Sequence, residues 1–364
     1  MGGNAPDEPR FSVRSRNNAS KHRFDAKGTH DMAQVIKYPA ERLGVRGGRA
    51  HRSAPGAASV SATPLVVTTT GLTKSYGSAT VVSNMHLEVP KGSVYGFLGP
   101  NGAGKSTTMK MLLGLVHPTS GTATILGMPV TEQNRLEVLR HVGSLIESPS
   151  CYPHLTACEN LEIVRRLRGL PASSIDEALG IVRLDDAKTA KKLVGHFSLG
   201  MKQRLGIAAA LMGHPKLLML DEPTNGLDPS GIHEIRALVR ELPSRFGCTV
   251  IVSSHLLSEI DQMADHVGII RSGQMVWQGS SADLHAKARH WISLRTTDNE
   301  KAAQLLPGAV VEGAWLNVKA VDDGVIADAS LKLAQAGIGL IRMEERSESL
   351  EDIFLKLTGM EASL

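Results

Sequence analysis

The stretch that decides the fold of this chain is Gly99-Pro100-Asn101-Gly102-Ala103-Gly104-Lys105-Ser106-Thr107. It matches G-x-x-x-x-G-K-[ST], a loop that binds phosphate groups between a strand and a helix. A short apolar run precedes it at residues 93–98, and apolar residues at helical spacing follow it. Glycines allow successive backbone N–H groups to face one anion, and the helix N-terminus adds partial positive charge. We therefore expect all nine residues to bind the phosphates of a nucleotide.

Two side chains of this loop have more specific expected roles. Lys105 would reach the β- and γ-phosphates, and the Ser106 hydroxyl would ligate Mg²⁺. The alternative is a glycine-rich turn that matches the pattern by chance. The other motifs of the chain decide against that alternative.

Composition excludes several classes of protein. The chain has 364 residues, of which 42% are hydrophobic, and this is enough for two or three domains with their own cores. The net charge of +4 arises in residues 1–64, because the remaining residues carry 29 basic and 31 acidic side chains. We therefore expect no nucleic-acid partner. Three cysteines form no C-x-x-C pair, which suits a reducing compartment, and no apolar run is long enough to span a membrane.

The sequence divides into three parts. Residues 1–64 are rich in Arg, Gly, Ala and Ser without periodicity, so we expect a disordered basic extension, with Met32 as an alternative start. A solvated tail is favoured there over a basic arm that touches anionic lipid. Residues 65–290 alternate strand-like and helical patterns, and residues 291–364 form a small α+β accessory domain without a chemical motif. Further expected elements are strands at 65–70, 81–89 and 310–319, a turn at 71–77 and a helix over 155–196. A last helix is expected to begin at Ser349, with Asp352 three residues on as its capping box.

Two apolar runs end at polar side chains suited to catalysis. Leu217–Leu220 predicts a central parallel strand, and Asp221 and Glu222 follow it directly. Asp221 is expected to ligate Mg²⁺ and Glu222 to polarise the attacking water, because paired acids after a buried strand are unusual on a solvated face. The run 249–254 ends in the same way at His255, for which we favour a γ-phosphate contact over a structural role.

Three residues outside these runs are also candidates. Tyr76 lies 23 positions before Gly99 and offers an aromatic face for a nucleobase, although a half-buried strand residue is the alternative. Ser198 is the expected N-cap of a helix that begins at Leu199. Glu147 follows an apolar run and precedes a proline. We expect it to approach the phosphates through Mg²⁺, and the alternative is that it only solvates its loop.

Taken in order, these motifs resemble the ATP-binding cassette (ABC) family, the nucleotide-binding subunits of ABC transporters. The resemblance covers roughly residues 65–290. Residues 99–107 look like the Walker A motif and residues 217–222 like Walker B with its catalytic glutamate. Residues 225–228 look like the D-loop, His255 like the switch histidine and Tyr76 like the adenine-stacking residue.

Two departures from the commonest family pattern indicate a branch. The signature is Phe197-Ser198-Leu199-Gly200-Met201 instead of Leu-Ser-Gly-Gly-Gln, and Glu147 replaces the usual glutamine. Both departures resemble the bacitracin-exporter and lantibiotic-immunity branch. The accessory domain is similar to that of drug- and peptide-exporting cassettes.

The resemblance implies a fold, a partner and a mechanism. The fold would be an α/β P-loop NTPase cassette with a mostly parallel RecA-like sheet, an antiparallel β subdomain and a helical subdomain. ATP with Mg²⁺ would bind between two cassettes, in a homodimer or heterodimer, with Ser198, Gly200 and Asp228 among the nucleotide contacts. Hydrolysis would drive a separate membrane permease that exports a drug or peptide antibiotic, at the cytoplasmic face of the membrane.

Two other functions are weighed against the transporter. A soluble ABC-type ATPase in translation would carry two cassettes, and one in DNA repair would insert a long coiled coil before the signature. Lys105 and Ser198 are only 93 positions apart, which leaves no room for such an insertion. A P-loop kinase would lack the signature helix.

Overall fold

The computed structural model describes residues 63–319 and 323–358. The predicted disorder of residues 1–64 falls almost wholly outside the described residues. No described helix has the length and apolarity needed to cross a membrane.

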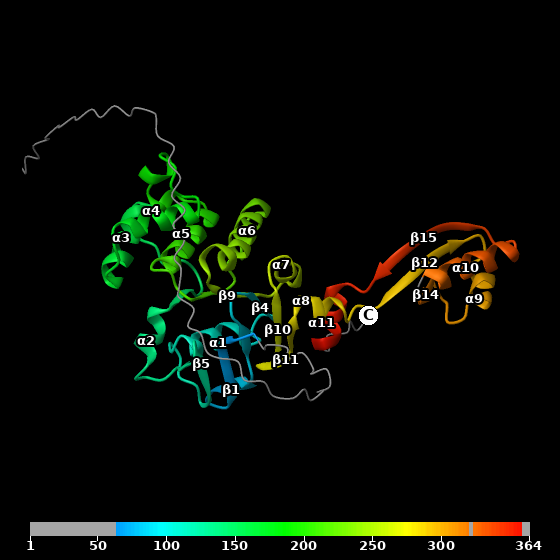
Figure 1. The fold of residues 1–364 in the computed structure, drawn as a ribbon, viewed down its shortest axis with the longest axis horizontal. Coiled ribbons are helices and arrows are strands. Elements are labelled where there is room, and N and C mark those ends of the chain that lie inside the picture. The colour runs from blue at the N-terminus through cyan, green and yellow to red at the C-terminus, as the bar shows by residue number, and fades with distance from the viewer. Residues whose placement is uncertain (1–62, 320–322, 359–364) are drawn as a thin grey trace, which may run out of the picture. The chain divides into compact units, whose positions relative to one another are not determined.

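A six-stranded sheet forms the centre of the cassette (Figure 1). Its order is β11-β10-β4-β9-β8-β7, and all neighbours are parallel except the β10–β11 pair. The strands are short and mostly buried, as expected for a sheet covered on both faces. Their bounds are Val94–Leu98 (β4), Val142–Leu145 (β7), Leu217–Leu220 (β8), Thr249–Ser254 (β9), His266–Arg271 (β10) and Gln274–Ser280 (β11).

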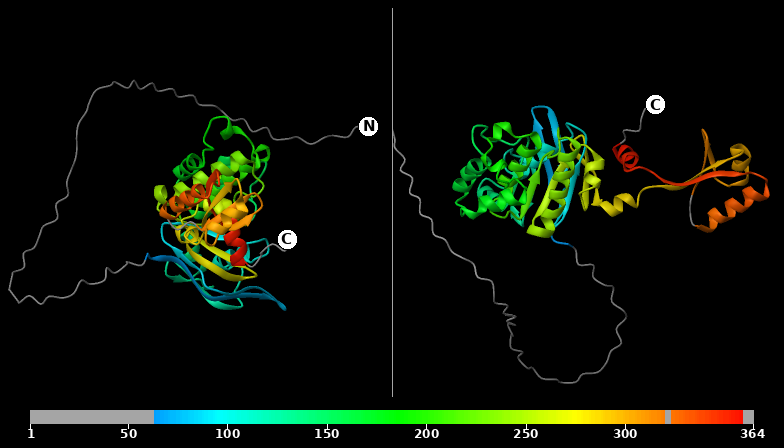
Figure 2. Two further views of the ribbon diagram at one scale, coloured as in Figure 1. Left: turned by 90° about the vertical axis from the view of Figure 1, so that its right-hand side faces the viewer. Right: turned by 90° about the horizontal axis from the view of Figure 1, so that it is seen from above.

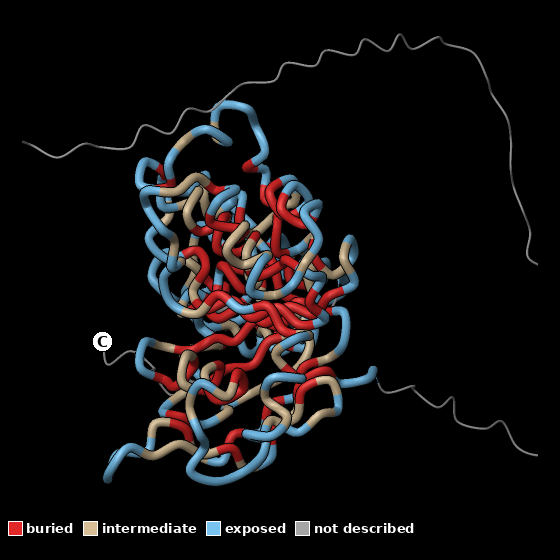
Figure 3. Tube along the Cα trace, turned by 90° about the vertical axis from the view of Figure 1, so that its left-hand side faces the viewer, coloured by how far each residue is buried: buried red, intermediate tan, exposed pale blue. Residues whose placement is uncertain are grey.

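Alternate residues of these strands enter two different cores. On β8, Leu217 and Met219 join the core that includes helix α1 (Lys105–Leu112), while Leu218 and Leu220 join the core of the helices on the other face. This alternation follows from the pleat of the strand, in which successive side chains point to opposite faces of the sheet. Figure 3 shows the buried residues gathered in the interior of the trace. The helices of the second core include α5 (Leu199–Leu211), α6 (Pro229–Phe246), α7 (Leu257–Asp261) and α8 (Ser281–His285).

An antiparallel sheet of order β2-β1-β5-β6, with β3 paired to β1, packs over the face that carries α1. The expected turn at 71–77 is wrong, because β1 continues through it and the chain turns only at Gly77. Gly71, with φ of 61°, stays in the strand at an irregularity of the β1 pairing. The expected strand 81–89 is divided into two. The bounds are Leu65–Tyr76 (β1), Ala79–Met85 (β2), Glu88–Pro90 (β3), Ser120–Ile125 (β5) and Met128–Pro129 (β6).

The helical subdomain contains α3 (Ala157–Arg168) and α4 (Ser173–Ile181), whereas α2 (Arg135–Arg140) places Val138 in the core that includes α1. Thr156 and Glu159 form a reciprocal cap at the start of α3. The expectation of helix up to residue 196 is wrong, since only two short 3₁₀ turns follow α4. Figure 1 shows α3 and α4 (green) and the antiparallel sheet (blue to cyan) at opposite sides of the central sheet. The predicted fold class, with its three subdomains, is confirmed.

A separate sheet of order β13-β14-β12-β15 lies between His290 and Ser347 (Figure 2). Helices α9 and α10 pack with it around a small core that includes Leu294, Leu316 and Leu333. The expected single strand 310–319 is a hairpin, because Gly313 adopts φ of 60° and reverses the chain. The bounds are His290–Thr296 (β12), Asn299–Leu305 (α9), Val310–Glu312 (β13), Trp315–Lys319 (β14), Asp323–Gln335 (α10) and Leu340–Ser347 (β15).

The last helix, α11 (Leu350–Thr358), begins at the predicted cap. The Ser349 hydroxyl donates to Asp352 Oδ2, and the Asp352 N–H donates back to Ser349 Oγ. Ile353, 4% exposed, packs in the core of the cassette and not in the core of the β12–β15 sheet.

Candidate functional site

The order of the central sheet brings the main predicted residues to one edge. Strands β4, β9, β8 and β7 are consecutive neighbours and run parallel, so their carboxyl ends lie together. The segments that follow them carry, in that order, the phosphate-binding loop, His255, the Asp221–Glu222 pair and Glu147. This edge is where open parallel sheets bind ligands.

The phosphate-binding loop has the backbone that its glycines predict. Gly102 and Gly104 have φ of 79° and 105°. Gly104 is the N-cap of α1 and provides no side chain to its first N–H groups, which therefore remain available to an anion. A Cβ at Gly104 would lie 2.8 Å from the carbonyl oxygen of Val81, so this position excludes a side chain.

Lys105 lies inside this loop with only 5% of its surface exposed. Its Nζ donates to the carbonyl oxygens of Gly99, at 2.7 Å, and Pro100, at 3.3 Å. The same Nζ lies 3.2 Å from Glu222 Oε1. The ammonium is therefore held at the centre of the loop, where the phosphate oxygens of a nucleotide would replace the carboxylate.

Asp221 and Glu222 are joined by a residue that the sequence analysis missed. The buried Ser253 donates from Oγ to Asp221 Oδ1, at 2.6 Å, and accepts from the Glu222 N–H, at 2.9 Å. It lies at the end of β9, next to β8 in the sheet. A small polar residue near the end of an otherwise apolar strand was the signal available in the sequence.

The Glu222 carboxylate lies between two cationic or ionisable partners. Its Oε1 faces Lys105, and its Oε2 lies 2.8 Å from His255 Nδ1. Glu222 has φ of 47°, which is unusual for a residue other than glycine and occurs often at functional sites. The arrangement suits a carboxylate that orients a water molecule, with the histidine ring fixing its direction.

The donor set fits Mg²⁺. Ser106 offers a hydroxyl and Asp221 a buried carboxylate, and Mg²⁺ in nucleotide sites uses one or two carboxylates together with substrate phosphates and water. Within the described ranges no three His, Cys, Asp or Glu side chains gather as a metal-binding group. This pattern is expected where phosphates supply part of the coordination.

Glu147 has a different partner from the one expected. Its Oε1 lies 2.5 Å from Lys110 Nζ, and 68% of its side chain is exposed. This hydrogen bond lowers the pKa of Glu147 and raises the pKa of Lys110, on which the charge of Asp221 also acts. Lys110, on α1, was missed by the sequence analysis, although its spacing of five from Lys105 places it on the same helix. The proposed role of Glu147 at Mg²⁺ stays a prediction.

The other predicted nucleotide contacts bond within their own segments. Ser198 caps α5 as predicted, since its Oγ accepts from the Met201 N–H, with Gly200 in the first turn. Asp228 caps α6 by accepting from the Gly231 N–H at 3.1 Å. Tyr76 is half exposed at the end of β1, with Lys74 Nζ 4.8 Å from its ring centroid. Among the described residues, none of these three has a hydrogen bond to the phosphate-binding loop, and their nucleotide contacts stay predictions.

Comparisons with known proteins agree with this geometry. A family model described as ABC transporter matches residues 82–225. The bacitracin transport ATP-binding protein BcrA of Enterococcus faecalis is 42% identical over 301 residues, which cover 81% of this chain and 96% of that protein. The lantibiotic transport ATP-binding protein SrtF of Streptococcus pyogenes is 47% identical over 205 residues, covering 56% of this chain and 86% of that protein.

A solved structure gives the same fold. The cbiO1 protein of Clostridium perfringens, part of the ABC transporter complex cbiONQ, is 26% identical with a TM-score of 0.56. The match covers 61% of this chain and 91% of that one. The chain therefore belongs to the ABC transporter family, as an ATP-binding subunit that hydrolyses ATP.

Proposed function

We propose that this chain powers the export of a peptide antibiotic of the bacitracin or lantibiotic type through a separate membrane permease. The observation that supports this cargo is the identity of 42% across nearly the whole length of a bacitracin transport ATP-binding protein. The signature and Glu147 were assigned to the same branch from the sequence. A soluble role in translation or DNA maintenance has no support among these relatives.

In the proposed mechanism the chain's own residues bind and orient ATP. The N–H groups of residues 99–107 and the Lys105 ammonium hold the phosphates, and Tyr76 stacks on the base. Ser106 and Asp221 would hold Mg²⁺, which would supply positive charge to offset the negative charge of the phosphates. Glu222 takes the proton of the attacking water, and His255 orients Glu222 and contacts the γ-phosphate.

A second cassette completes the site. Ser198 and Gly200 lie at the exposed N-terminus of α5, where free N–H groups suit an anion. In a head-to-tail dimer this terminus would close over the γ-phosphate bound to the partner, with Asp228 beside the contact. Hydrolysis would open the dimer at the cytoplasmic face of the membrane and move the permease. The three parts, residues 1–64, 65–290 and 291–364, are the proposed domain division.

The test uses the chain together with its permease in cells challenged with bacitracin. Lys105→Ala should weaken ATP binding about 10- to 100-fold, because a hydrogen bond to a charged group contributes about 1.5–3 kcal/mol. Glu222→Gln should bind ATP and lose hydrolysis by about 10²–10⁴-fold. Both should abolish resistance, whereas the exposed Lys91→Ala should not. Bacitracin resistance that persists in Glu222→Gln would contradict the proposed function.

A further inference from the structure

A buried carboxylate on α7 has no part in the mechanism above. Glu259 is 5% exposed, and its Oε2 accepts two hydrogen bonds, from Thr224 Oγ1 at 2.7 Å and from Ser254 Oγ at 2.9 Å. Both hydroxyls are themselves buried. Burying a carboxylate is unfavourable unless hydrogen bonds compensate, so removing this acid would leave two donors without their acceptor.

The two hydroxyls belong to the segments that carry the reacting groups. Thr224 lies two residues after Glu222, and Ser254 directly precedes His255. Ser254 also contacts the phosphate-binding loop, because its carbonyl oxygen accepts from the Gly99 N–H at 3.3 Å. One oxygen of Glu259 therefore links the segment after β8 to the last residue of β9.

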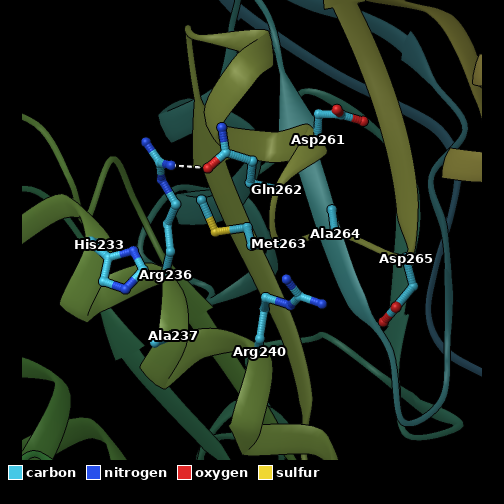
Figure 4. A pocket seen from close by; sticks show the side chains of 9 residues that line it. All are labelled: His233, Arg236, Ala237, Arg240, Asp261, Gln262, Met263, Ala264 and Asp265. Atoms are coloured by element: carbon cyan, nitrogen blue, oxygen red, sulfur yellow. Dashed lines mark hydrogen bonds between the residues drawn. The ribbon is translucent and has the colours of Figure 1, made fainter.

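The outer end of α7 is less closely packed. It faces α6 across an open hollow of about 320 Å³ (Figure 4). The hydrogen bond that crosses the hollow runs from Arg236 on α6 to Gln262. Two arginines and two aspartates line the hollow, so its charges balance and do not indicate an ionic ligand. On the inner side, Glu259 is the polar link from α7 to the segment that carries Glu222.

We propose that Glu259 is a positioning residue for ATP hydrolysis. Acting through Thr224 and Ser254, it holds Glu222 and His255 at the separation that their hydrogen bond requires. This inference rests on the roles proposed for Glu222 and His255. Because a displacement of about 1 Å can cost about 10²-fold in rate, loss of the link lowers kcat and leaves ATP binding to the phosphate-binding loop intact.

The test separates positioning from folding with a matched control. Glu259→Ala is expected to lower kcat about 10- to 100-fold with an unchanged Kd for ATP. Glu259→Gln keeps an oxygen that accepts both hydroxyls, and it should recover most of kcat. Met263→Ala removes a buried apolar side chain next to α7 and should lower the melting temperature without lowering kcat. Wild-type kcat in folded Glu259→Ala, or no recovery in Glu259→Gln, would overturn the proposal.

Thr224→Val provides the same test where Glu259→Ala does not fold. It removes one donor and leaves Ser254 on the carboxylate, so kcat should fall at constant Kd, and an unchanged kcat counts against the proposal. Glu222→Gln, measured in parallel, distinguishes a failure of the catalytic role of Glu222 from a failure of the positioning role of Glu259. Wild-type hydrolysis in Glu222→Gln overturns the assigned catalytic residue itself. An inactive Glu222→Gln beside a fully active Glu259→Ala overturns only the positioning role.

Discussion

At the scale of single residues, contacts between β8 and β9 position the acids of the site, because Ser253 bonds both Asp221 and the Glu222 N–H. The glycines at 102 and 104 and the acids after β8 follow from a motif of adjacent residues. Ser253 and Glu259 act on groups about 30 positions away, and no local pattern reports such a contact. Their roles become visible only when β8 and β9 are placed side by side.

Glu147 shows how a partner changes the expectation for a residue. Its pairing with Lys110 offsets the negative charge of a carboxylate that would otherwise repel the γ-phosphate. We expect Glu147→Ala to weaken the Mg²⁺ dependence of hydrolysis and its coupling to the permease. Glu147→Gln should be much milder, because an amide still ligates the metal. ATPase rates against Mg²⁺ concentration check this, and identical curves for wild type and Glu147→Ala would end the idea.

At the scale of elements, helix starts were predicted better than helix lengths and strand breaks. Ser198 and Ser349 were identified as caps because a capping side chain and its partner lie within three residues. The end of α3 was missed because Gly169, the residue that closes it with φ of 65°, was not recognised among the helical residues around it. Leu167 lies at a spacing of three from Val164, as expected for an apolar helix face, but it is 83% exposed.

The cap of α5 allows structure and function to be separated at one position. Ser198→Ala removes the acceptor for the Met201 N–H and should cost about 1 kcal/mol of stability. Ser198→Asn retains a capping side chain and should restore the melting temperature. If the hydroxyl contacts the γ-phosphate of a partner cassette, Ser198→Asn stays slow in hydrolysis. Recovery of both properties by asparagine would leave Ser198 with a capping role alone.

At the scale of the whole chain, Glu348 joins the end of β15 to α11. Glu348 is buried, and its side chain pairs with Lys356. Its N–H donates to the carbonyl oxygen of Arg289, and its Oε2 accepts from the Arg289 N–H. The Lys356 hydrogen bond is the main reason that the pKa of Glu348 lies below its usual value. A lowered carboxyl pKa stabilises the folded state above the unfolded pKa, and this contribution is lost as pH falls through the folded value.

Glu348→Gln should therefore be less stable than wild type at pH 7, by about 1 kcal/mol at most because the lysine is partly exposed. The difference should vanish at acid pH, where wild-type Glu348 is protonated. Urea unfolding between pH 3 and pH 7 measures this, with the exposed Glu351→Gln as the control. A stability difference that does not change with pH would refute the ionic role.

The change in sequence pattern near residue 290 suggested a domain boundary, which stays a prediction, but it did not indicate which core the last helix packs against. A capped amphipathic helix has the same sequence pattern whichever core it packs against, and only the structure shows Ile353 in the core of the cassette. Within the proposed accessory domain, residues 291–364, the sheet would then form its own folding unit, and α11 would form part of the folding unit of the cassette.

Two matched substitutions test this arrangement. Ile353→Ala should destabilise the cassette by about 2–5 kcal/mol, since it opens a cavity in the core that also holds Leu257 and Ile260 of α7. Leu316→Ala makes a similar cavity in the core of the β12–β15 sheet, and it should lower only the temperature at which that sheet unfolds. Calorimetry with and without ATP distinguishes the two, because bound ATP raises only the transition of the unit that binds it. If Ile353→Ala leaves the ATP-sensitive transition unchanged, α11 belongs with the accessory sheet and the cassette ends before it.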